Sequence, residues 1–167
     1  MSELVDEVDD ADTVLRVVSR AQMRRERLMH RAVFIAVIDT GGRLLVHRRS
    51  EAKDLWPGWW DMAVGGVVSA GEAYRDAAVR ELREEIGLVA DPADPAELGH
   101  GTYIDADVAL QGRCYVVRSD GPFVFADGEV VEARFVTAAD FADMRQRVQF
   151  LPDSVTLLLP LIEHLLR

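Results

Sequence analysis

Cysteine is nearly absent from this sequence of 167 residues, which contains only Cys114. One thiol cannot close an internal disulfide, and such sparing use of cysteine is typical of a reducing compartment. Long hydrophobic runs are absent too, since no stretch approaches the ~20 apolar residues that span a bilayer. The segment 1–13 is acidic and carries no apolar run, so we expect no signal peptide there. These absences predict a cytoplasmic protein that makes no membrane contact.

Positive charge is also scarce. The chain has 19 Lys and Arg against 29 Asp and Glu, which gives a formal net charge of -10. Nucleic-acid backbones are bound by clustered Lys and Arg, so this balance argues against nucleic acid as the main partner. It does not argue against a small phosphorylated substrate that is held through a metal ion.

The length and the 49% hydrophobic content predict one domain over 1–167 with a substantial core. We expect an N-terminal hairpin and short helix in 1–29, a core in 30–150 and a C-terminal helix in 151–167. Residues 32–38 form a continuous, β-branched apolar run, which is typical of a strand buried on both faces. Further strands and helices are expected at 43–49, 97–103, 113–118, 129–136 and 138–148. This succession predicts an α+β fold with a mixed sheet, and the Leu-rich C-terminus would serve as core packing or as the face of a homodimer.

The stretch 65–88 carries the most information. Ser69 and Glu72 form a capping-box pattern, in which each side chain can bond the amide of the other residue. A helix should follow from about Gly71 and end near Gly87, because glycine suits a helix C-terminus.

Four charged residues crowd the end of this predicted helix. Glu81, Glu84 and Glu85 fall within an arc of roughly 100° on the helix surface, so their carboxylates repel each other. Hard cations such as Mg²⁺ take oxygen ligands and would relieve that repulsion. Arg80 lies four residues before Glu84 and can pair with it. The alternative is a solvated acidic face with one ion pair.

The spacing of these and neighbouring residues favours the metal site over a solvated acidic face. The stretch contains a pattern of seven fixed identities and two aliphatic positions: Gly66, Glu72, Arg80, Glu81, Leu82, Glu84, Glu85, Gly87 and Leu88. This pattern resembles, without gap or substitution, the signature of the Nudix family, whose members cleave diphosphates linked to another moiety. The resemblance implies an α/β/α sandwich around a mixed sheet, with a catalytic loop-helix-loop.

The resemblance also implies roles for individual residues. The Gly65 carbonyl and the carboxylates of Glu81 and Glu85, assisted by Glu84, would hold Mg²⁺ or Mn²⁺. Arg80 would orient the helix carboxylates and Glu72 would help to order the site. Glu84 or Glu81 is expected to accept the proton of the attacking water. A downstream carboxylate could serve instead, and the candidates are Asp105, Asp107, Glu129 and Glu132.

The segment 3–150, and most clearly 30–88, further resembles a Nudix branch that includes isopentenyl-diphosphate isomerase and isomerase-like hydrolases. Gly65 stands where the isomerases carry a catalytic Cys, and Val67 stands where they carry a metal-binding His. The chain therefore resembles an isomerase-like scaffold that hydrolyses a phosphoanhydride. Arg49 and Lys53 match basic positions that contact the diphosphate, although a surface role is the alternative for both. The competing functions are isopentenyl-diphosphate isomerase and a non-catalytic nucleotide-binding module.

All three tryptophans of the chain lie within 56–60, just before this stretch. They could plug the protein under a loop or form an aromatic wall beside the substrate. We expect Trp56 and Trp59 to contact a planar, nucleotide-like moiety. The arginines of 20–28 are expected to be solvated or paired with acidic residues.

Overall fold

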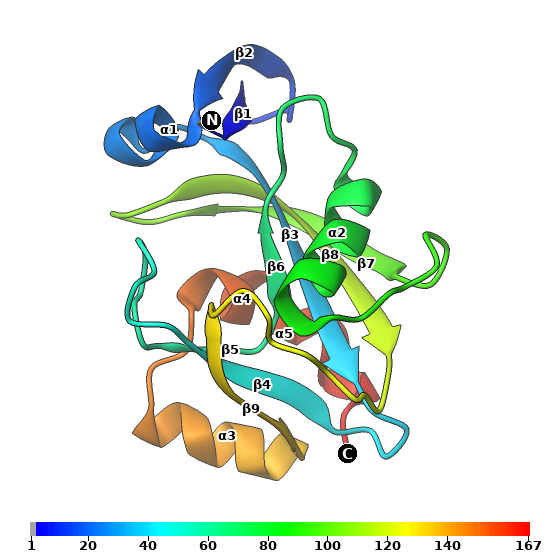
Figure 1. Cartoon of the computed structure of the whole chain (residues 1–167). Coiled ribbons are helices and arrows are strands. Elements are labelled where there is room, and N and C mark those ends of the chain that lie inside the picture. The colour runs from blue at the N-terminus through cyan, green and yellow to red at the C-terminus, as the bar shows by residue number, and fades with distance from the viewer. Residues whose placement is uncertain (1–2) are drawn as a thin grey trace.

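The computed structural model describes residues 3–167 and is organised around one mixed sheet (Figure 1). The strands of this sheet are β3 (His30–Ile38), β4 (Leu44–Arg49), β5 (Trp60–Asp61), β6 (Val64–Val67), β7 (Ala96–Ile104), β8 (Ala109–Arg118) and β9 (Val130–Val136). β3 runs parallel to β8 and antiparallel to β6 and β4, while β9 adds to the far side of β4. The predicted α+β fold with a mixed sheet is confirmed.

β3 forms the centre of the protein because both of its faces are apolar. Successive side chains of a strand point to opposite faces of the sheet. Val33, Ile35 and Val37 accordingly pack into the core that includes helix α2. The alternate residues Ala32, Phe34, Ala36 and Ile38 pack into a second core on the other face. The prediction of a strand buried on both sides is therefore confirmed.

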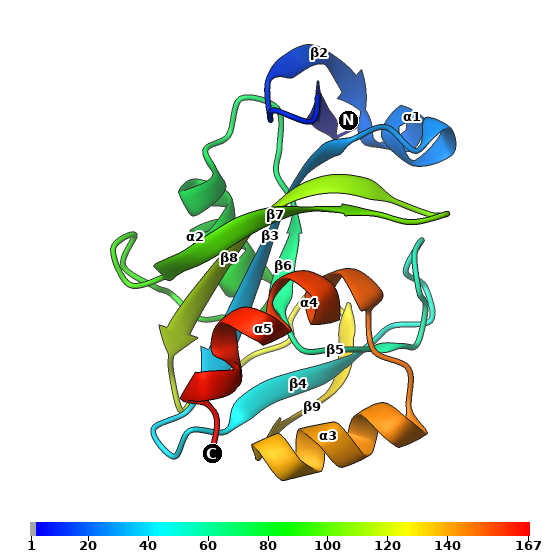
Figure 2. The same cartoon turned by 180° about the vertical axis from the view of Figure 1, so that it is seen from behind.

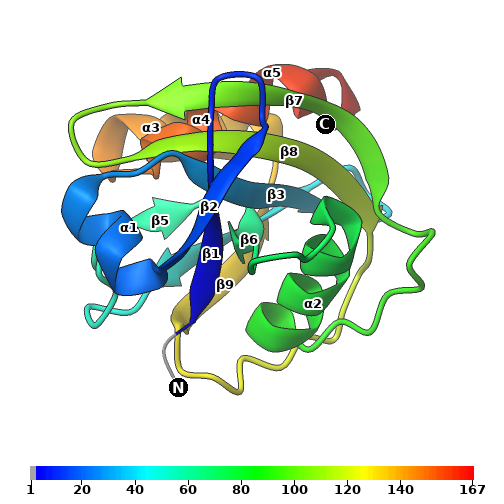
Figure 3. The same cartoon turned by 90° about the horizontal axis from the view of Figure 1, so that it is seen from above.

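Helices cover both faces of the sheet. They are α2 (Tyr74–Ile86), α3 (Ala138–Arg147), α4 (Pro152–Leu157), α5 (Leu159–Ile162) and the 3-10 turn η1 (Glu163–Leu165). Seen from above, α2 lies on one side of β3 and β8, and α4 with α5 lies on the other (Figure 3). This is the expected α/β/α layering. None of the helices in 3–167 has the length and apolar character needed to cross a membrane.

The C-terminal segment differs from the single interrupted helix that we expected. It consists of α4, α5 and η1 in succession, which lie across the face of the sheet that is turned toward the viewer in Figure 2. Pro160 has no amide hydrogen to continue the hydrogen bonds of α4, so a new helix starts instead. Leu158 and Ile162 are fully buried in the core, so these two side chains serve core packing.

Helix α2 begins later than the capping-box pattern predicted. Its N-cap is Ala73, and no side chain caps it. Half of the predicted box is nevertheless present, because Glu72 Oε1 accepts a hydrogen bond from the Ser69 amide at 3.1 Å. The Glu72 amide bonds the Ser69 carbonyl rather than its hydroxyl, at 3.0 Å, so the pattern closes a turn ahead of the helix. The end is as predicted, since Gly87 adopts the left-handed conformation with φ 68°.

The N-terminal residues form a hairpin and a helix, as predicted. They are β1 (Leu4–Val8), β2 (Val14–Ser19) and α1 (Arg20–Glu26), with the Ser19 hydroxyl accepting from the amide of Gln22 at 3.1 Å. This unit lies beside the upper end of β3 and close to the loop that precedes α2 (Figures 1 and 3).

Several hydrogen bonds tie that loop to the hairpin. The Ala70 amide donates to the Leu4 carbonyl at 2.9 Å, and the Gly71 amide donates to Asp6 Oδ2 at 3.0 Å. The Tyr74 hydroxyl donates to Asp12 Oδ2 at 2.9 Å. The hairpin therefore braces the loop from which α2 starts.

Leu82 secures the other side of α2, because its side chain is 0% exposed between the helix and the sheet. We predict that Leu82→Ala lowers the free energy of unfolding by about 2–5 kcal/mol, through lost burial and the cavity left behind. Urea unfolding followed by circular dichroism measures this change. Leu15→Ala is the matched control, since Leu15 is 58% exposed on β2, and an equal loss in both variants would contradict this role of Leu82.

Candidate functional site

Two adjoining hollows lie beside α2. The carboxylate cleft is lined by Glu81, Glu84 and Glu85, and the inner cavity extends from it toward the other face of the sheet. They share five lining residues, which are Arg20, Lys53, Gly65, Gly66 and Val67. A single elongated ligand could therefore occupy both.

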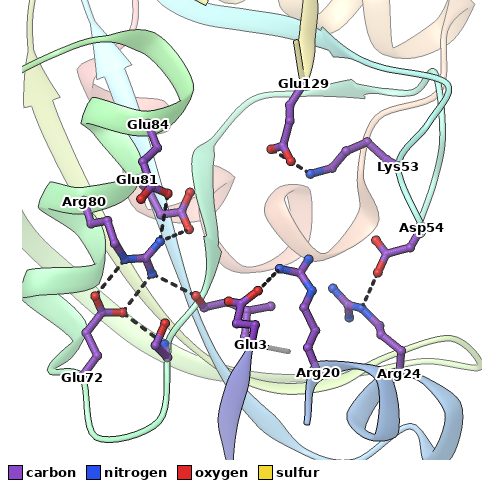
Figure 4. A network of polar contacts seen from close by, with 12 residues as sticks. Glu3, Arg20, Arg24, Lys53, Asp54, Glu72, Arg80, Glu81, Glu84 and Glu129 are labelled. Atoms are coloured by element: carbon purple, nitrogen blue, oxygen red, sulfur yellow. Dashed lines mark hydrogen bonds and ion pairs between the residues drawn. The ribbon is translucent and has the colours of Figure 1, made fainter. Parts of the chain in front are cut away.

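Arg80 is the centre of a network of ion pairs at the cleft (Figure 4). Its Nε and Nη2 donate to the two oxygens of Glu72 at 2.8 and 2.9 Å, which is a bidentate pair. Its Nη1 donates to Glu81 Oε1 at 2.9 Å and to Glu84 Oε2 at 3.2 Å. The expected contact with Glu84 is thus present, but Glu72 holds the guanidinium more closely. Arg80 Nη2 also donates to the Val67 carbonyl at 3.2 Å, so the network joins α2 to β6.

The carboxylates of this network differ in their protonation. Burial opposes ionisation of Glu72, yet hydrogen bonds from Arg80 and the Ser69 amide keep its pKa below the usual range. Burial raises the pKa of Glu81 to about 7, and Arg80 only partly offsets that effect. Burial, together with the charges of Glu81 and Asp61, raises the pKa of Glu85 well above its ordinary value.

Glu85 carries the clearest sign of a missing partner. Its side chain is 7% exposed, and its Oε2 has no hydrogen-bond partner among residues 3–167. A buried carboxylate oxygen without a partner is costly. A divalent cation would satisfy it and would favour the ionised forms of Glu81 and Glu85.

Two glycines bring the chain close to these carboxylates. A Cβ at Gly66 would lie 2.6 Å from Glu81 Oε1, and a Cβ at Gly65 would lie 1.9 Å from the Val33 carbonyl. At Gly65 the close atom belongs to the backbone, so only glycine fits, whereas a side chain at Gly66 would displace the Glu81 carboxylate; both residues line the cleft. Within residues 3–167, no three acidic, His or Cys side chains converge on one point. A bound ion would therefore complete its shell with a backbone carbonyl, water or phosphate oxygens.

The four downstream acidic candidates occupy different places. Only Glu129 lines the cleft, where its Oε2 accepts from Lys53 Nζ at 3.0 Å. Glu132 instead pairs with Arg48 at 3.5 Å. Asp105 accepts hydrogen bonds from the amides of its own turn, including that of Asp107. The structure thus brings Glu129, and not the other three, to the helix carboxylates.

The predicted substrate-binding residues do not all reach the hollows. Lys53 lines both hollows, while Arg49 and Trp56 line the inner cavity. Trp56 has φ 46°, a conformation that is uncommon for a bulky residue and often found at functional sites. Trp59 lines neither hollow and stacks on Trp56 with ring centroids 6.2 Å apart. Trp56 therefore lies between Trp59 and the inner cavity.

Sequence reasoning missed four residues that line the inner cavity. Arg20 and Arg24 come from α1, where we expected solvated or paired arginines; Arg24 does pair with Asp54 at 3.1 Å. Asp61 and Asp153 are both 7% exposed. The only sequence signal for these two was an acid next to an apolar or aromatic run, which many surface turns share.

The thiol of Cys114 lies outside both hollows. It is buried in β8, where its Sγ donates to the Leu157 carbonyl at 3.6 Å, and burial raises its pKa to about 12. No other cysteine exists in the chain, so the site offers no thiol.

Comparison with known proteins agrees with this geometry. The family model described as the NUDIX domain matches residues 28–156. The chain is 38% identical to the uncharacterized Nudix hydrolase YfcD of Escherichia coli strain K12 over 154 residues, covering 92% of this chain and 83% of that protein. It is 35% identical to the uncharacterized Nudix hydrolase PA4841 of Pseudomonas aeruginosa, covering 92% of this chain and 90% of that protein.

Solved structures share the fold. The crystal structure of DR0079 from Deinococcus radiodurans matches with a TM-score of 0.81 and 26% identity, covering 99% of this chain and all of that one. The matched family model covers most of the chain, and the signature residues surround the cleft beside α2. The chain belongs to the Nudix family and is a Nudix hydrolase that acts on pyrophosphate bonds.

Proposed function

We propose that this protein hydrolyses a nucleoside diphosphate linked to another moiety, in a reaction that depends on Mg²⁺ or Mn²⁺. The observation that carries the proposal is the buried, unpartnered Oε2 of Glu85, next to the poorly ionised Glu81. A buried carboxylate that lacks a counter-charge suits a divalent cation together with phosphate oxygens. The Gly65 carbonyl, Glu81 and Glu85, with Glu84 assisting, would hold the ion.

The bound ion would lower the pKa of water and neutralise charge on the phosphoryl oxygens. The side chains of the protein would accept the proton, position the carboxylates and bind the phosphate. Glu84 is half exposed at the cleft and can accept the proton of the attacking water. Glu129 is the second candidate for this step, since it faces the same cleft. Arg80 would hold Glu81 and Glu84 in place, and Lys53 would bind a phosphate oxygen.

A nucleotide is the moiety that the surroundings favour. The inner cavity adjoins the cleft and has Trp56 in its wall, and aromatic faces suit planar groups. A further neighbour in fold is the NUDIX domain of Shewanella oneidensis NrtR, solved as a complex with ADP ribose, with a TM-score of 0.62 and 14% identity over 83% of this chain and 94% of that one.

The alternative functions have less support. An isopentenyl-diphosphate isomerase would need a thiol and an imidazole where this chain has Gly65 and Val67, and Cys114 is buried elsewhere. A non-catalytic binding module needs no complete set of carboxylates, yet Glu81, Glu84 and Glu85 all line the cleft. The isomerase-like branch, the cytoplasmic location and a homodimer remain predictions.

Removing the proton acceptor tests the proposed reaction. We predict that Glu84→Gln lowers kcat by about 10²- to 10⁴-fold and leaves KM nearly unchanged, because an amide cannot take up the proton. Phosphate release from nucleoside diphosphates and nucleotide-linked diphosphates, with and without Mg²⁺, provides the measurement. Glu132→Gln is the matched control, since Glu132 pairs with Arg48 outside both hollows. Comparison with Glu129→Gln shows which of the two acids is the base. Phosphate release that does not need a metal ion and that persists in all three variants would refute the proposal.

The buried carboxylates also predict how stability depends on pH. Burial raises the pKa of Glu81 from 4.5 to about 7, so the folded state holds a proton that the unfolded chain has released. The stability that the protonated form of Glu81 gives the folded state is fully present below pH 4.5. It is lost as pH rises through 7, with an amplitude of roughly 3 kcal/mol. We therefore expect the metal-free protein to lose stability between pH 5 and pH 8.

Mg²⁺ should reverse that loss, because it binds the ionised carboxylates. The rise in melting temperature on adding Mg²⁺ should be larger at pH 8 than at pH 5, and differential scanning calorimetry would show it. Glu81→Gln, which has no proton to lose, should reduce the pH dependence, and the remainder should come from Glu85 and Asp153, whose pKa values burial also raises. Equal stabilisation at both pH values would count against a cation site at Glu81.

A further inference from the structure

The inner cavity has apolar walls and a polar end. Its apolar lining includes Phe34, Leu55, Trp56, Val108, Leu110 and Leu151. Two acids and a histidine, Asp61, Asp153 and His30, interrupt this lining, and each is more than nine-tenths buried. Buried polar side chains in such a place need hydrogen-bond partners.

Asp153 has one oxygen engaged and one free. Its Oδ1 accepts a hydrogen bond from the Ser154 amide at 2.8 Å, which sets the plane of the carboxyl group. No hydrogen bond from residues 3–167 to its Oδ2 is found, and this oxygen is not sealed in the core, since the side chain lines the cavity. Burial and the charge of Asp61 raise the pKa of Asp153 to about 7, so the group is an acceptor in slightly alkaline solution.

The two neighbouring groups are acceptors too. Asp61 Oδ1 accepts from the Ala63 amide at 3.0 Å, and its Oδ2 has no partner within the described chain. His30 Nδ1 lies 3.0 Å from the Leu28 carbonyl, which can only accept, so Nδ1 carries the proton. Burial lowers the pKa of His30 to about 4. The ring is therefore neutral, and its Nε2 is an acceptor.

Two basic residues of the cavity, Lys53 and Arg20, are more exposed than these acceptors. Arg49, by contrast, has a buried Nε without a partner among residues 3–167, and its charge acts to lower the pKa of Asp153. Lys53 and Arg20 also line the carboxylate cleft, and their side chains are 16% and 33% exposed. Figure 4 shows them on the far side of the cleft from Arg80, Glu81 and Glu84. A ligand with its phosphates between these groups would place the attached moiety in the inner cavity, against the buried acceptors.

We propose that the inner cavity binds a heterocycle that carries an amino group, such as the base of a guanine, adenine or cytosine nucleotide, and that Asp153 Oδ2 accepts a hydrogen bond from that amino group. This inference rests on the proposed hydrolase function and adds to it the class of the base. An apolar chain or a heterocycle without hydrogen-bond donors would leave the buried carboxylate unpartnered. Asp153 is thus assigned as a specificity-determining residue.

Three pairs of substrates test the amino group directly. The members of each pair differ only in whether the base carries its amino group: GDP and IDP, ADP and purine riboside diphosphate, CDP and 2-pyrimidinone riboside diphosphate. At pH 8, where Asp153 is ionised, we expect kcat/KM for the preferred nucleotide to exceed that of its partner by at least about tenfold. A ratio near one in all three pairs would overturn the inference.

Substitution of Asp153 tests the assignment. Asp153→Asn should keep its carbonyl on the Ser154 amide and turn its NH₂ group into the cavity, where it would face the amino group of the base. The ratio within the preferred pair should then fall at least tenfold, through KM rather than kcat. Asp153→Ala removes the acceptor without adding a donor, so its ratio should approach one. Asp140→Asn is the matched control on the exposed surface of α3 and should change nothing.

Binding measurements separate this inference from the proposed function. Calorimetry with GMP and IMP, AMP and purine riboside monophosphate, and CMP and its 2-pyrimidinone analogue needs neither Mg²⁺ nor turnover. Preference for the amino-bearing member without any Mg²⁺-dependent hydrolysis would retain the inference and remove the hydrolase proposal. Mg²⁺-dependent hydrolysis without such a preference would retain the hydrolase proposal and remove this inference. A preference that Asp153→Asn leaves intact would also remove the assignment of Asp153.

Discussion

The bidentate pair between Arg80 and Glu72 is the interaction on which the site depends. Glu72 belongs to the loop before α2, and Arg80 belongs to the helix, so the pair fixes how the loop meets the helix. The same guanidinium also bonds Glu81 and Glu84. One positive charge thus faces three carboxylates, and Glu85 lies beyond its reach. Among residues 3–167, Glu85 therefore lacks a positive partner in a desolvated place, which is the electrostatic basis for binding a cation.

The N-terminal hairpin supports this arrangement from outside the matched NUDIX region. Asp6 bonds the Gly71 amide, and Asp12 bonds both the Tyr74 hydroxyl and the Arg31 guanidinium. The bonds to Gly71 and Tyr74 hold the chain on both sides of Glu72. The helix that follows the hairpin brings Arg20 and Arg24 to the cavity. Residues 3–26 thus contribute both to the support of the loop and to the surface that a ligand would meet.

Packing on the two faces of β3 explains why the cleft and the cavity adjoin. The odd-numbered residues of the strand support α2 and its carboxylates. The even-numbered residues, with Phe34 among them, face the C-terminal helices. Asp153 stands at the start of α4 on that second side, while Gly65 and Gly66 of β6 pair with β3 between the two regions. A strand that is apolar on both faces therefore places acidic groups from distant parts of the chain around one continuous space.

Much of this protein was predictable from local sequence. The grouping of Arg80, Glu81, Glu84 and Glu85 near the end of one helix, the apolar run of β3 and the left-handed Gly87 each follow from near neighbours in the chain, whose geometry the backbone restricts. The start of α2 was misjudged, because Ser69 and Glu72 form a turn that the hairpin also holds. The tertiary structure alone decided that Glu129 faces the cleft while Glu132 does not, that Trp59 lies behind Trp56, and that Asp61 and Asp153 share a cavity. The positions of Glu129, Asp61 and Asp153 depend on which residues far apart in the sequence become neighbours, and that choice is made by the packing of the two cores rather than by any local pattern.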